Sequence, residues 1–403
     1  MKRVIKNLIK KIITLIFYLF LEFYLFLHKE RQKKQNDKTI KKLLIIRIDA
    51  IGDFIIFSPM LRYYRILYPH YHITLLVDEE VLSLAQRINE IDELISFSRK
   101  KIVNIVNIDL IYIITYIRRL LKKIKEESFD VVIYPTYSRD LIGDFIVRLS
   151  RAREKIGFDG DICNITLKKK LKNNKYYTKL ISVKPGIILE TERNKEFIEG
   201  LGLKVTNSIP NFTPSNEDKK IGCELLFNNG LKSINNFIVI NPGAQWKGKI
   251  WPLKKYVELI VWLKKEKNID IVICGSKNEY SLAEKIKTIS NIPIINISGK
   301  TSLPVLAAIL KESLLYIGND SGIIHLASAV GVPTICIMGG GHFGRFFPYG
   351  DLKKNRIVYY KMDCFNCNWR CIYPNKRNNP MPCISNIEVN SVLEEIKKVL
   401  MSD

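Results

Sequence analysis

The sequence predicts an α/β protein with two Rossmann-like halves that face one cleft. Two motifs support this fold, because each follows an apolar run and opens a helical pattern: RIDAIGDF at residues 47–54 and GNDSGIIHLASAVGVP at 318–333. A third segment, NPGAQWKGKIWP at 241–252, is also a strand-to-loop transition and places lysines beside a turn. The length of 403 residues agrees, since it suffices for two or three domains with their own cores.

Residues 1–40 differ in composition from the rest of the chain. The stretch IITLIFYLFLEFYLFL at 12–27 has one charge, Glu22, and basic residues flank it on both sides. As a helix it would be about 24 Å long, short of the ~30 Å hydrocarbon core of a bilayer. No small-residue cleavage site follows, which argues against a signal peptide. We predict an apolar helix, peripheral or monotopic on the anionic cytoplasmic face of the inner membrane, with a short span or a protein-buried helix as alternatives.

In the first half, residues 41–206, short apolar runs alternate with helical periods. We predict strands at 43–48, 73–77 and 131–134, and helices at 54–67, 102–125 and 190–201. The segment 159–184 is polar and basic, and we interpret it as loops with a hairpin over the cleft.

The second half, residues 237–387, repeats this alternation. Its predicted strands lie at 237–241, 271–274, 294–297, 314–317 and 334–338, and its predicted helices at 253–267, 280–289, 303–311 and 323–330. Prolines and turn residues at 207–218 indicate an interdomain connection, which with one helix occupies 207–236. Residues 388–403 form a C-terminal helix that could pack back on the first domain.

The first motif predicts a carboxylate at the ligand-binding edge of the first sheet. A strand ending at Ile48, a turn with Gly52 and a helix beginning near Asp53 bring backbone N–H groups and one acidic side chain to that edge. Gly52 would let a substrate approach the backbone closely. The alternative for Asp53 is a plain helix cap, worth ~1 kcal/mol.

The last motif predicts an anion site at the start of a helix. Asp320, Ser321 and Gly322 form a turn whose N–H groups and helix dipole suit a diphosphate. Because a carboxylate repels phosphate, Asp320 should face sugar hydroxyls instead. His325 lies one turn into the helix, where a buried packing role is the alternative.

The middle motif adds a cation. Lys247 and Lys249 extend from a loop after Pro242 and Gly243, so a lysine there can neutralise charge on a departing phosphate. Lys249 is favoured because the following Trp-Pro pair should anchor it, although either lysine could be solvated surface.

These three motifs in this order resemble glycosyltransferase family nine, the ADP-heptose:lipopolysaccharide heptosyltransferases, from about residue 41 to 387. The resemblance implies a GT-B architecture, with the acceptor on the first Rossmann-like domain and the donor nucleotide on the second. It also implies inverting transfer that needs no metal or other cofactor for catalysis.

The resemblance assigns roles to individual residues. Asp53 matches the general base and Lys249 the lysine that steadies the leaving diphosphate. Donor binding is implied for Gly52 and for the Asp-Thr-Gly-x-x-His segment, here Asp320, Ser321, Gly322 and His325, with Ser in place of Thr. Glu279, after the Cys274-Gly275 turn, is the nearest candidate for the acidic residue at the donor ribose.

A cluster of cysteines follows the last predicted strand. Cys364, Cys367, Cys371 and Cys383 have the spacing C-x2-C-x3-C-x11-C, which could bind structural zinc, while disulfides or free thiols stay open. The other four, Cys163, Cys223, Cys274 and Cys336, are predicted to be small core residues.

The functional prediction is transfer of a heptose, or a related sugar, from an ADP-sugar to a lipid-linked saccharide in lipopolysaccharide or lipooligosaccharide core synthesis. The net charge of +24, from 64 Lys+Arg against 40 Asp+Glu, favours anionic partners such as a membrane surface, but a lysine-rich surface without a partner is the alternative. We expect no nucleic-acid partner, since basic and aromatic residues are not interleaved on a sheet or a recognition helix. A different nucleotide-sugar donor, or a non-catalytic membrane-tethered scaffold, remain the rival functions.

Overall fold

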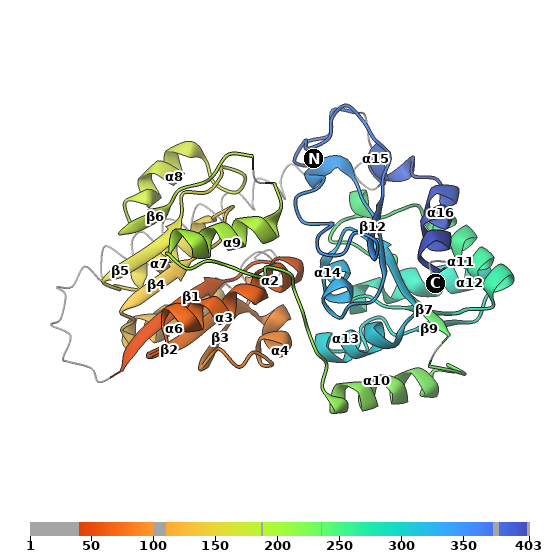
Figure 1. The fold of residues 1–403 in the computed structure, drawn as a ribbon, viewed down its shortest axis with the longest axis horizontal. Helices are drawn as coiled ribbons and strands as arrows, with labels where there is room; N and C mark the ends of the chain where they lie inside the picture. The colour runs from red at the N-terminus through yellow and green to blue at the C-terminus, as the bar shows by residue number, and fades with distance from the viewer. Residues whose placement is uncertain (1–39, 100–109, 187, 235, 374–378, 401–403) are drawn as a thin grey trace. The chain divides into compact units, whose positions relative to one another are not determined.

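The computed structural model of the chain describes residues 40–99, 110–186, 188–234, 236–373 and 379–400. It contains two parallel sheets of six strands each, with the orders β3-β2-β1-β4-β5-β6 and β12-β11-β10-β7-β8-β9 (Figure 1). Read from β9, the second order repeats the first, and it is the strand order of the Rossmann fold. The predicted α/β class with two Rossmann-like sheets is therefore confirmed, whereas the predicted N-terminal apolar helix lies outside the described residues.

The first sheet is built around β1 (Lys41–Arg47), which pairs with both β2 and β4. Residues Leu43–Ile46 of β1 are completely buried, as expected for a parallel strand covered on both faces. The other strands are β2 (Tyr71–Asp78), β3 (Glu93–Phe97), β4 (Val131–Tyr134), β5 (Glu154–Phe158) and β6 (Lys179–Ile181). The accompanying helices are α3 (Leu61–Leu67), α4 (Leu82–Ala85), α6 (Leu110–Glu127), α7 (Leu141–Leu149) and α8 (Leu167–Asn174).

The second sheet is built around β10 (Leu315–Asn319), which pairs with β7 and β11. Its other strands are β7 (Phe237–Asn241), β8 (Asp270–Ile273), β9 (Ile294–Asn296), β11 (Thr334–Ile337) and β12 (Asn355–Val358). Helices α11 (Leu253–Lys267), α12 (Tyr280–Ser290) and α16 (Val389–Leu400) cover one face, and α13 (Leu303–Glu312) and α14 (Gly322–Ala329) the other (Figure 1). Helix α10 (Asn216–Asn228) packs on α13, and α15 (Pro382–Ser385) is a short turn before α16.

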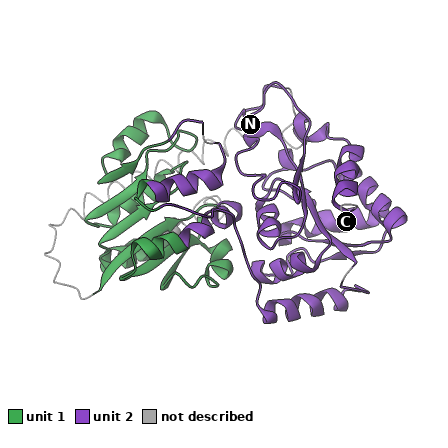
Figure 2. Ribbon diagram, viewed as in Figure 1, with its two compact units in different colours: residues 1–49, 62–183, 200–203 green, residues 50–61, 184–199, 204–403 purple. Residues whose placement is uncertain are grey.

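The chain divides into two compact units, coloured separately in Figure 2. The first comprises the chain up to Asp49 with 62–183 and 200–203, and the second comprises 50–61, 184–199 and the chain from Lys204. Helix α2 (Ile51–Phe57) directly follows β1 in sequence, yet it belongs to the second unit, where it packs on α14. Helix α9 (Glu190–Gly200) also lies almost entirely in the second unit.

The segment 159–184 does not form the predicted hairpin. It contains α8 and the edge strand β6, which runs parallel to β5. Thr166 caps α8, because its hydroxyl accepts a hydrogen bond from the backbone N–H of Lys169 at 3.4 Å. The sequence LKKKLKNN has only two apolar residues and therefore lacks the periodic apolar face by which helices are found.

The last helix packs within the second unit, so the expected packing on the first domain is wrong. Val392 and Ile396 of α16 are completely buried in the core that also contains Leu259 and Ile260 of α11. Among the described helices, none is both long enough and apolar enough to cross a membrane.

Candidate active site

Lys249 and Asp320 form an ion pair in the second unit, beyond the carboxyl end of β10. The Nζ atom of Lys249 lies 2.8 Å from Oδ2 of Asp320, and the two side chains are 14% and 13% exposed. Burial favours the neutral form of Asp320, but the charge and hydrogen bond of Lys249 outweigh it and hold the pKa of Asp320 below its ordinary value. Lys247, by contrast, is exposed.

The loop that carries this lysine is anchored to the end of β10. Asn319 accepts a hydrogen bond from the backbone N–H of Trp251 at 3.1 Å, and its amide group donates to the carbonyl oxygens of Pro242 at 2.8 Å and Gly243 at 3.1 Å. The completely buried indole of Trp251 donates to the carbonyl oxygen of Ile387 at 2.9 Å. The predicted anchoring by Trp251 is confirmed, and Asn319 is the partner that sequence reasoning missed.

Ser321 occupies the N-cap position of α14 without capping the helix. Its Oγ atom is buried and makes no hydrogen bond to the described residues. The buried hydroxyl of Tyr316 is a neighbour but lacks hydrogen-bonding geometry toward it. A buried hydroxyl left unpaired is costly unless a ligand satisfies it, and the N–H groups at the start of a helix favour an anion at the same place.

His325 is buried on α14 and faces α2. Its Nδ1 atom is 3.1 Å from the hydroxyl of Tyr349, and the two rings stack with centroids 5.8 Å apart. A Cβ atom added at Gly52 would lie 2.6 Å from the His325 ring, and one at Gly322 would lie 3.0 Å from Cβ of Ile51. The two glycines therefore let α2 and α14 approach closely, and the contacts of His325 match the packing alternative.

Asp53 lies in the first turn of α2 and is partly exposed. The N-cap of this helix is Ala50, so Asp53 is not the cap that the alternative interpretation required. A carboxylate in the first turn is still favoured by the helix dipole.

Glu279 closes the turn that follows β8. Its Oε2 atom accepts hydrogen bonds from the backbone N–H of Ser276 at 2.6 Å and from its hydroxyl at 2.9 Å. Gly243 and Gly275 are both beside this carboxylate, because a Cβ at either position would approach it to 1.8 Å and 2.9 Å. Glu279 is thus held near the ends of β7 and β8, next to the anchored loop of Lys249.

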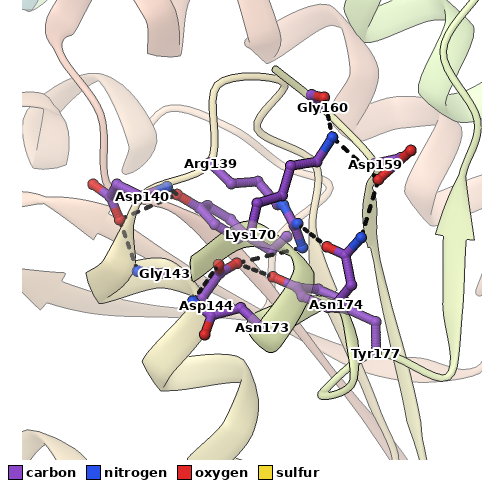
Figure 3. Close-up of polar contacts among 11 residues, drawn as sticks. Arg139, Asp140, Gly143, Asp144, Asp159, Gly160, Lys170, Asn173, Asn174 and Tyr177 are labelled. Atoms are coloured by element: carbon purple, nitrogen blue, oxygen red, sulfur yellow. Dashed lines mark hydrogen bonds and ion pairs between the residues drawn. The ribbon is translucent and has the colours of Figure 1, made fainter. Parts of the chain in front are cut away.

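The first unit contains a buried polar network that sequence reasoning missed (Figure 3). Asp144 is completely buried, lies 3.5 Å from Nη1 of Arg139, and accepts hydrogen bonds from Asn173 at 2.8 Å and Tyr177 at 2.5 Å. Arg139 also donates to Asn174 and lies over the ring of Tyr177 at 4.6 Å. The network links α8 to α7 and to the loop after β4, at the carboxyl edge of the first sheet.

Arg47, from the first motif, is part of a second cluster at that edge. It is 1% exposed, its Nε atom lies 3.0 Å from Oδ1 of Asp49, and its Nη1 atom donates to the hydroxyl of Thr136 at 3.3 Å. A buried arginine in an apolar strand is unusual and was the available signal for this site.

The four clustered cysteines lie close to one another. Burial and nearby thiols raise the pKa values of Cys364 and Cys383, and the latter accepts a hydrogen bond from the Gly340 N–H at 3.4 Å. All four are free thiols: Cys364, Cys367, Cys371 and Cys383. In the part of the chain that the structure describes, no group of three or more His, Cys, Asp or Glu side chains is arranged to hold a metal.

The remaining cysteines only partly follow the prediction of small core residues. Cys274 and Cys336 are buried, which confirms it for them. Cys163 is exposed, in the loop before α8, and Cys223 is half-buried on α10, so the prediction is wrong for Cys163 and only partly right for Cys223.

Two Rossmann-like sheets, with a lysine paired to a carboxylate beyond the carboxyl end of one of them, are an architecture that suits a nucleotide-binding enzyme. The family model for glycosyltransferase family 9 (heptosyltransferase) matches residues 117–371, more than half of the chain. The chain belongs to this family and is a glycosyltransferase.

Individual relatives agree with this assignment. The chain is 27% identical over 300 residues to lipopolysaccharide heptosyltransferase 3 of Escherichia coli K12, covering 72% of this chain and 79% of that protein. It is 28% identical over 190 residues to lipooligosaccharide heptosyltransferase 2 of Campylobacter jejuni, 45% of this chain and 58% of that protein.

Solved structures share the fold. E. coli heptosyltransferase WaaC with ADP-2-deoxy-2-fluoro heptose has a TM-score of 0.62 and 18% identity, covering 89% of this chain and 99% of that chain. The iron-containing dodecameric glycosyltransferase TibC of enterotoxigenic E. coli has a TM-score of 0.51 and 12% identity, covering 91% and 78%.

Proposed function

We propose that this enzyme transfers a heptose, or a closely related sugar, from an ADP-sugar to a lipid-linked saccharide of the lipopolysaccharide or lipooligosaccharide core. The names of the relatives support the reaction, and the ADP-heptose analogue in the WaaC structure supports the donor.

One observation of the site carries the proposal: at the start of α14, Asp320 pairs with the ammonium of Lys249, and the next residue, Ser321, has a buried hydroxyl without a hydrogen bond to the described residues. Lys249 and Ser321 can both satisfy oxygens of a diphosphate, together with the N–H groups of the helix start. Asp320 holds Lys249 in place before the donor binds and accepts hydrogen bonds from sugar hydroxyls afterwards. Glu279 is assigned to the ribose, and Gly52 and His325 shape the donor side through the contact of α2 with α14.

In the proposed reaction the acceptor hydroxyl attacks the anomeric carbon of the donor as the bond to the diphosphate oxygen breaks. Asp53 takes the proton of the hydroxyl, and Lys249 stabilises the negative charge that develops on the leaving diphosphate. The result is inversion at the anomeric carbon, an elongated saccharide and ADP. A carboxylate base and a lysine are sufficient for these steps.

The test is a thermal-shift and turnover screen of the purified protein against ADP, ADP-heptose, and UDP- and GDP-sugars, each with and without EDTA. Stabilisation by ADP and ADP-heptose, together with turnover that the chelator does not change, is the expected result. Preference for another nucleotide sugar would keep the enzyme class and change the donor. Neither stabilisation nor turnover with any nucleotide or nucleotide sugar would favour the non-catalytic scaffold.

The location at the cytoplasmic membrane face is part of the proposal. The net charge of +24 supports it, and so does α8, on which Leu167 and Leu171 are each 57% exposed beside the exposed Lys168 and Lys172. Apolar side chains between lysines suit an anionic bilayer surface.

The four cysteine thiols are proposed to have a structural role and to take no direct part in the transfer reaction. These thiols suit zinc or iron chemically, and TibC is described as iron-containing, although the described residues contain no group of three or more side chains arranged to hold a metal. Elemental analysis of protein purified without added metal decides between these states: one equivalent of zinc or iron, lost on chelation together with thermal stability, would establish a structural metal.

A further inference from the structure

We propose that Trp369 is a positioning residue for Lys249, and that the loop carrying it, residues 363–373 (the cysteine loop), thereby sets the reactivity of the donor site. The inference rests on the proposed role of Lys249 and adds a residue outside the three motifs. Sequence reasoning considered this loop only for its thiols.

Trp369 is the second side chain, after Asp320, that interacts with the ammonium of Lys249. The Nζ atom of Lys249 lies 4.9 Å from the centre of the Trp369 ring. The same atom lies 2.8 Å from Oδ2 of Asp320. Trp246, on the same loop as the lysine, meets Trp369 edge to face at 5.5 Å. The ammonium is thus held by one charged partner and one aromatic face.

An aromatic face suits this task better than a second carboxylate. It attracts a cation through its quadrupole and carries no net charge, so Lys249 keeps its full positive charge for the diphosphate. A second anion would repel the donor phosphates. The indole N–H of Trp369 is buried and makes no hydrogen bond to the described residues, so its ring acts through its faces and edges.

The glycine turn after β11 explains how the ring is held. A Cβ atom at Gly341 would lie 2.2 Å from the Trp369 ring, and one at Gly339 would lie 2.9 Å from it. The cysteine loop is tied to the same turn, because the backbone N–H of Asn366 donates to the carbonyl oxygen of Gly340 at 2.6 Å and the backbone N–H of Asn368 donates to that of Gly341 at 2.9 Å. The cysteine loop therefore packs against the run of glycines at 339–341.

The backbone of the cysteine loop is strained where the tryptophan sits. Asn366, Asn368 and Trp369 have φ values of 63°, 52° and 59°. Asparagine tolerates the left-handed region, but a bulky tryptophan there is an outlier that persists only where its surroundings hold it. The hydrogen bond from Arg370 N–H to the carbonyl oxygen of Cys367 at 2.9 Å closes this turn. Strain next to a charged site residue is consistent with a positioning task.

A double-mutant cycle tests the proposal. Trp369→Leu removes the aromatic face, Trp369→Phe keeps a face, and Lys249→Ala removes the cation. Trp262→Leu is the matched control, because Trp262 also lies near a lysine, Lys397, at 5.8 Å, but on α11. The readouts are kcat and KM for ADP-heptose, Kd for ADP, and Tm.

Trp369→Leu should lower kcat about tenfold while Phe restores most of it. In the Lys249→Ala background the same change should cost less than about twofold, because a positioning residue has nothing left to position. The control should keep the wild-type kcat.

Three results would overturn the proposal, and they show whether the proposed function fails with it. Equal losses from Trp369→Leu with and without Lys249, or a lowered Tm with unchanged kcat, would reduce Trp369 to a packing residue and leave the proposed function intact. Wild-type turnover by Lys249→Ala would instead remove the proposed role of the lysine, and the positioning role with it.

Discussion

At the scale of single residues, the ion pair between Lys249 and Asp320 links structure to chemistry. Each partner is mostly buried, so each depends on the other for compensation of its charge. The pair therefore contributes to stability before a donor binds and to charge neutralisation afterwards.

Lys249→Met should cost both stability and turnover. Asp320 would be left as a mostly buried charge without its cation, which should lower the free energy of unfolding by about 3 kcal/mol. Urea unfolding measures this, and the double variant Lys249→Met/Asp320→Asn should recover part of the loss. The kcat of Lys249→Met should fall by about 100-fold or more, as for loss of one transition-state donor. Wild-type stability of the single variant Lys249→Met would contradict the coupling.

Asp53→Asn should abolish transfer and leave ADP binding nearly unchanged. A base acts on the acceptor hydroxyl and not on the nucleotide, so the loss should appear in kcat. Titration with ADP by calorimetry provides the control, because the amide keeps the shape of the side chain. Weakened ADP binding, or turnover like that of the wild type, would argue against the assigned role.

His325 should make stability depend on pH. Burial, with a smaller contribution from Lys249, lowers the pKa of His325 from 6.5 to about 4 although Asp320 opposes this. Between those values the unfolded chain binds a proton that the folded chain does not, so stability falls as pH decreases from 6.5 to 4 and the loss levels off below 4. The total is about 3 kcal/mol. His325→Gln should reduce the pH dependence of the free energy of unfolding over this window. An unchanged slope of that free energy against pH would exclude His325 as its source.

At the scale of elements, the network of Arg139 and Asp144 shows how a polar helix is held. Helix α8 has few apolar residues, so Asn173 and Asn174 attach it through buried hydrogen bonds (Figure 3). Burial raises the pKa of Asp144 although Arg139 opposes the shift. The helix thus depends on satisfied polar contacts where other helices depend on an apolar face.

Asp144→Leu should destabilise the first unit by about 3 kcal/mol, because Arg139 would remain buried without its partner. Arg139→Met/Asp144→Leu should regain much of that loss. Lys122→Gln is the control, since it breaks only an exposed ion pair with Glu126 at 3.6 Å and should change stability by less than about 0.5 kcal/mol. Additive effects of the two buried substitutions would show that the pair is not coupled.

At the scale of the whole molecule, membrane attachment should be separable from the fold. The first described strand begins at Lys41, and all twelve described strands of the two sheets come from Lys41 onward. Deletion of residues 1–38 should release the protein from anionic vesicles in a flotation assay, with Tm and ADP binding retained. The quadruple change of Lys168, Lys169, Lys172 and Lys175 to Gln separates the contribution of α8. Vesicle binding that persists at full strength in the deletion would place attachment elsewhere.

Much of the second sheet could be predicted from sequence. Strand β7 and helix α11 agree with the predicted limits 237–241 and 253–267, and in the first sheet β4 agrees with 131–134. Buried parallel strands appear as unbroken apolar runs, and amphipathic helices repeat every 3.6 residues, so both signals are local. The edge strands β3, β6 and β12 were missed, and so was β5 next to β6, because partly exposed strands mix polar and apolar residues.

The sequence by itself determined the fold class, the family and the identity of the motif residues, because these depend on short segments and their order. Only the tertiary structure decided which residues meet. Lys249 and Asp320 are 71 positions apart, α2 follows β1 yet packs on α14, and Trp369 reaches the lysine from a loop considered only for its cysteines. Such contacts arise from the order of strands in a sheet and from packing between distant segments, which local periodicity does not encode.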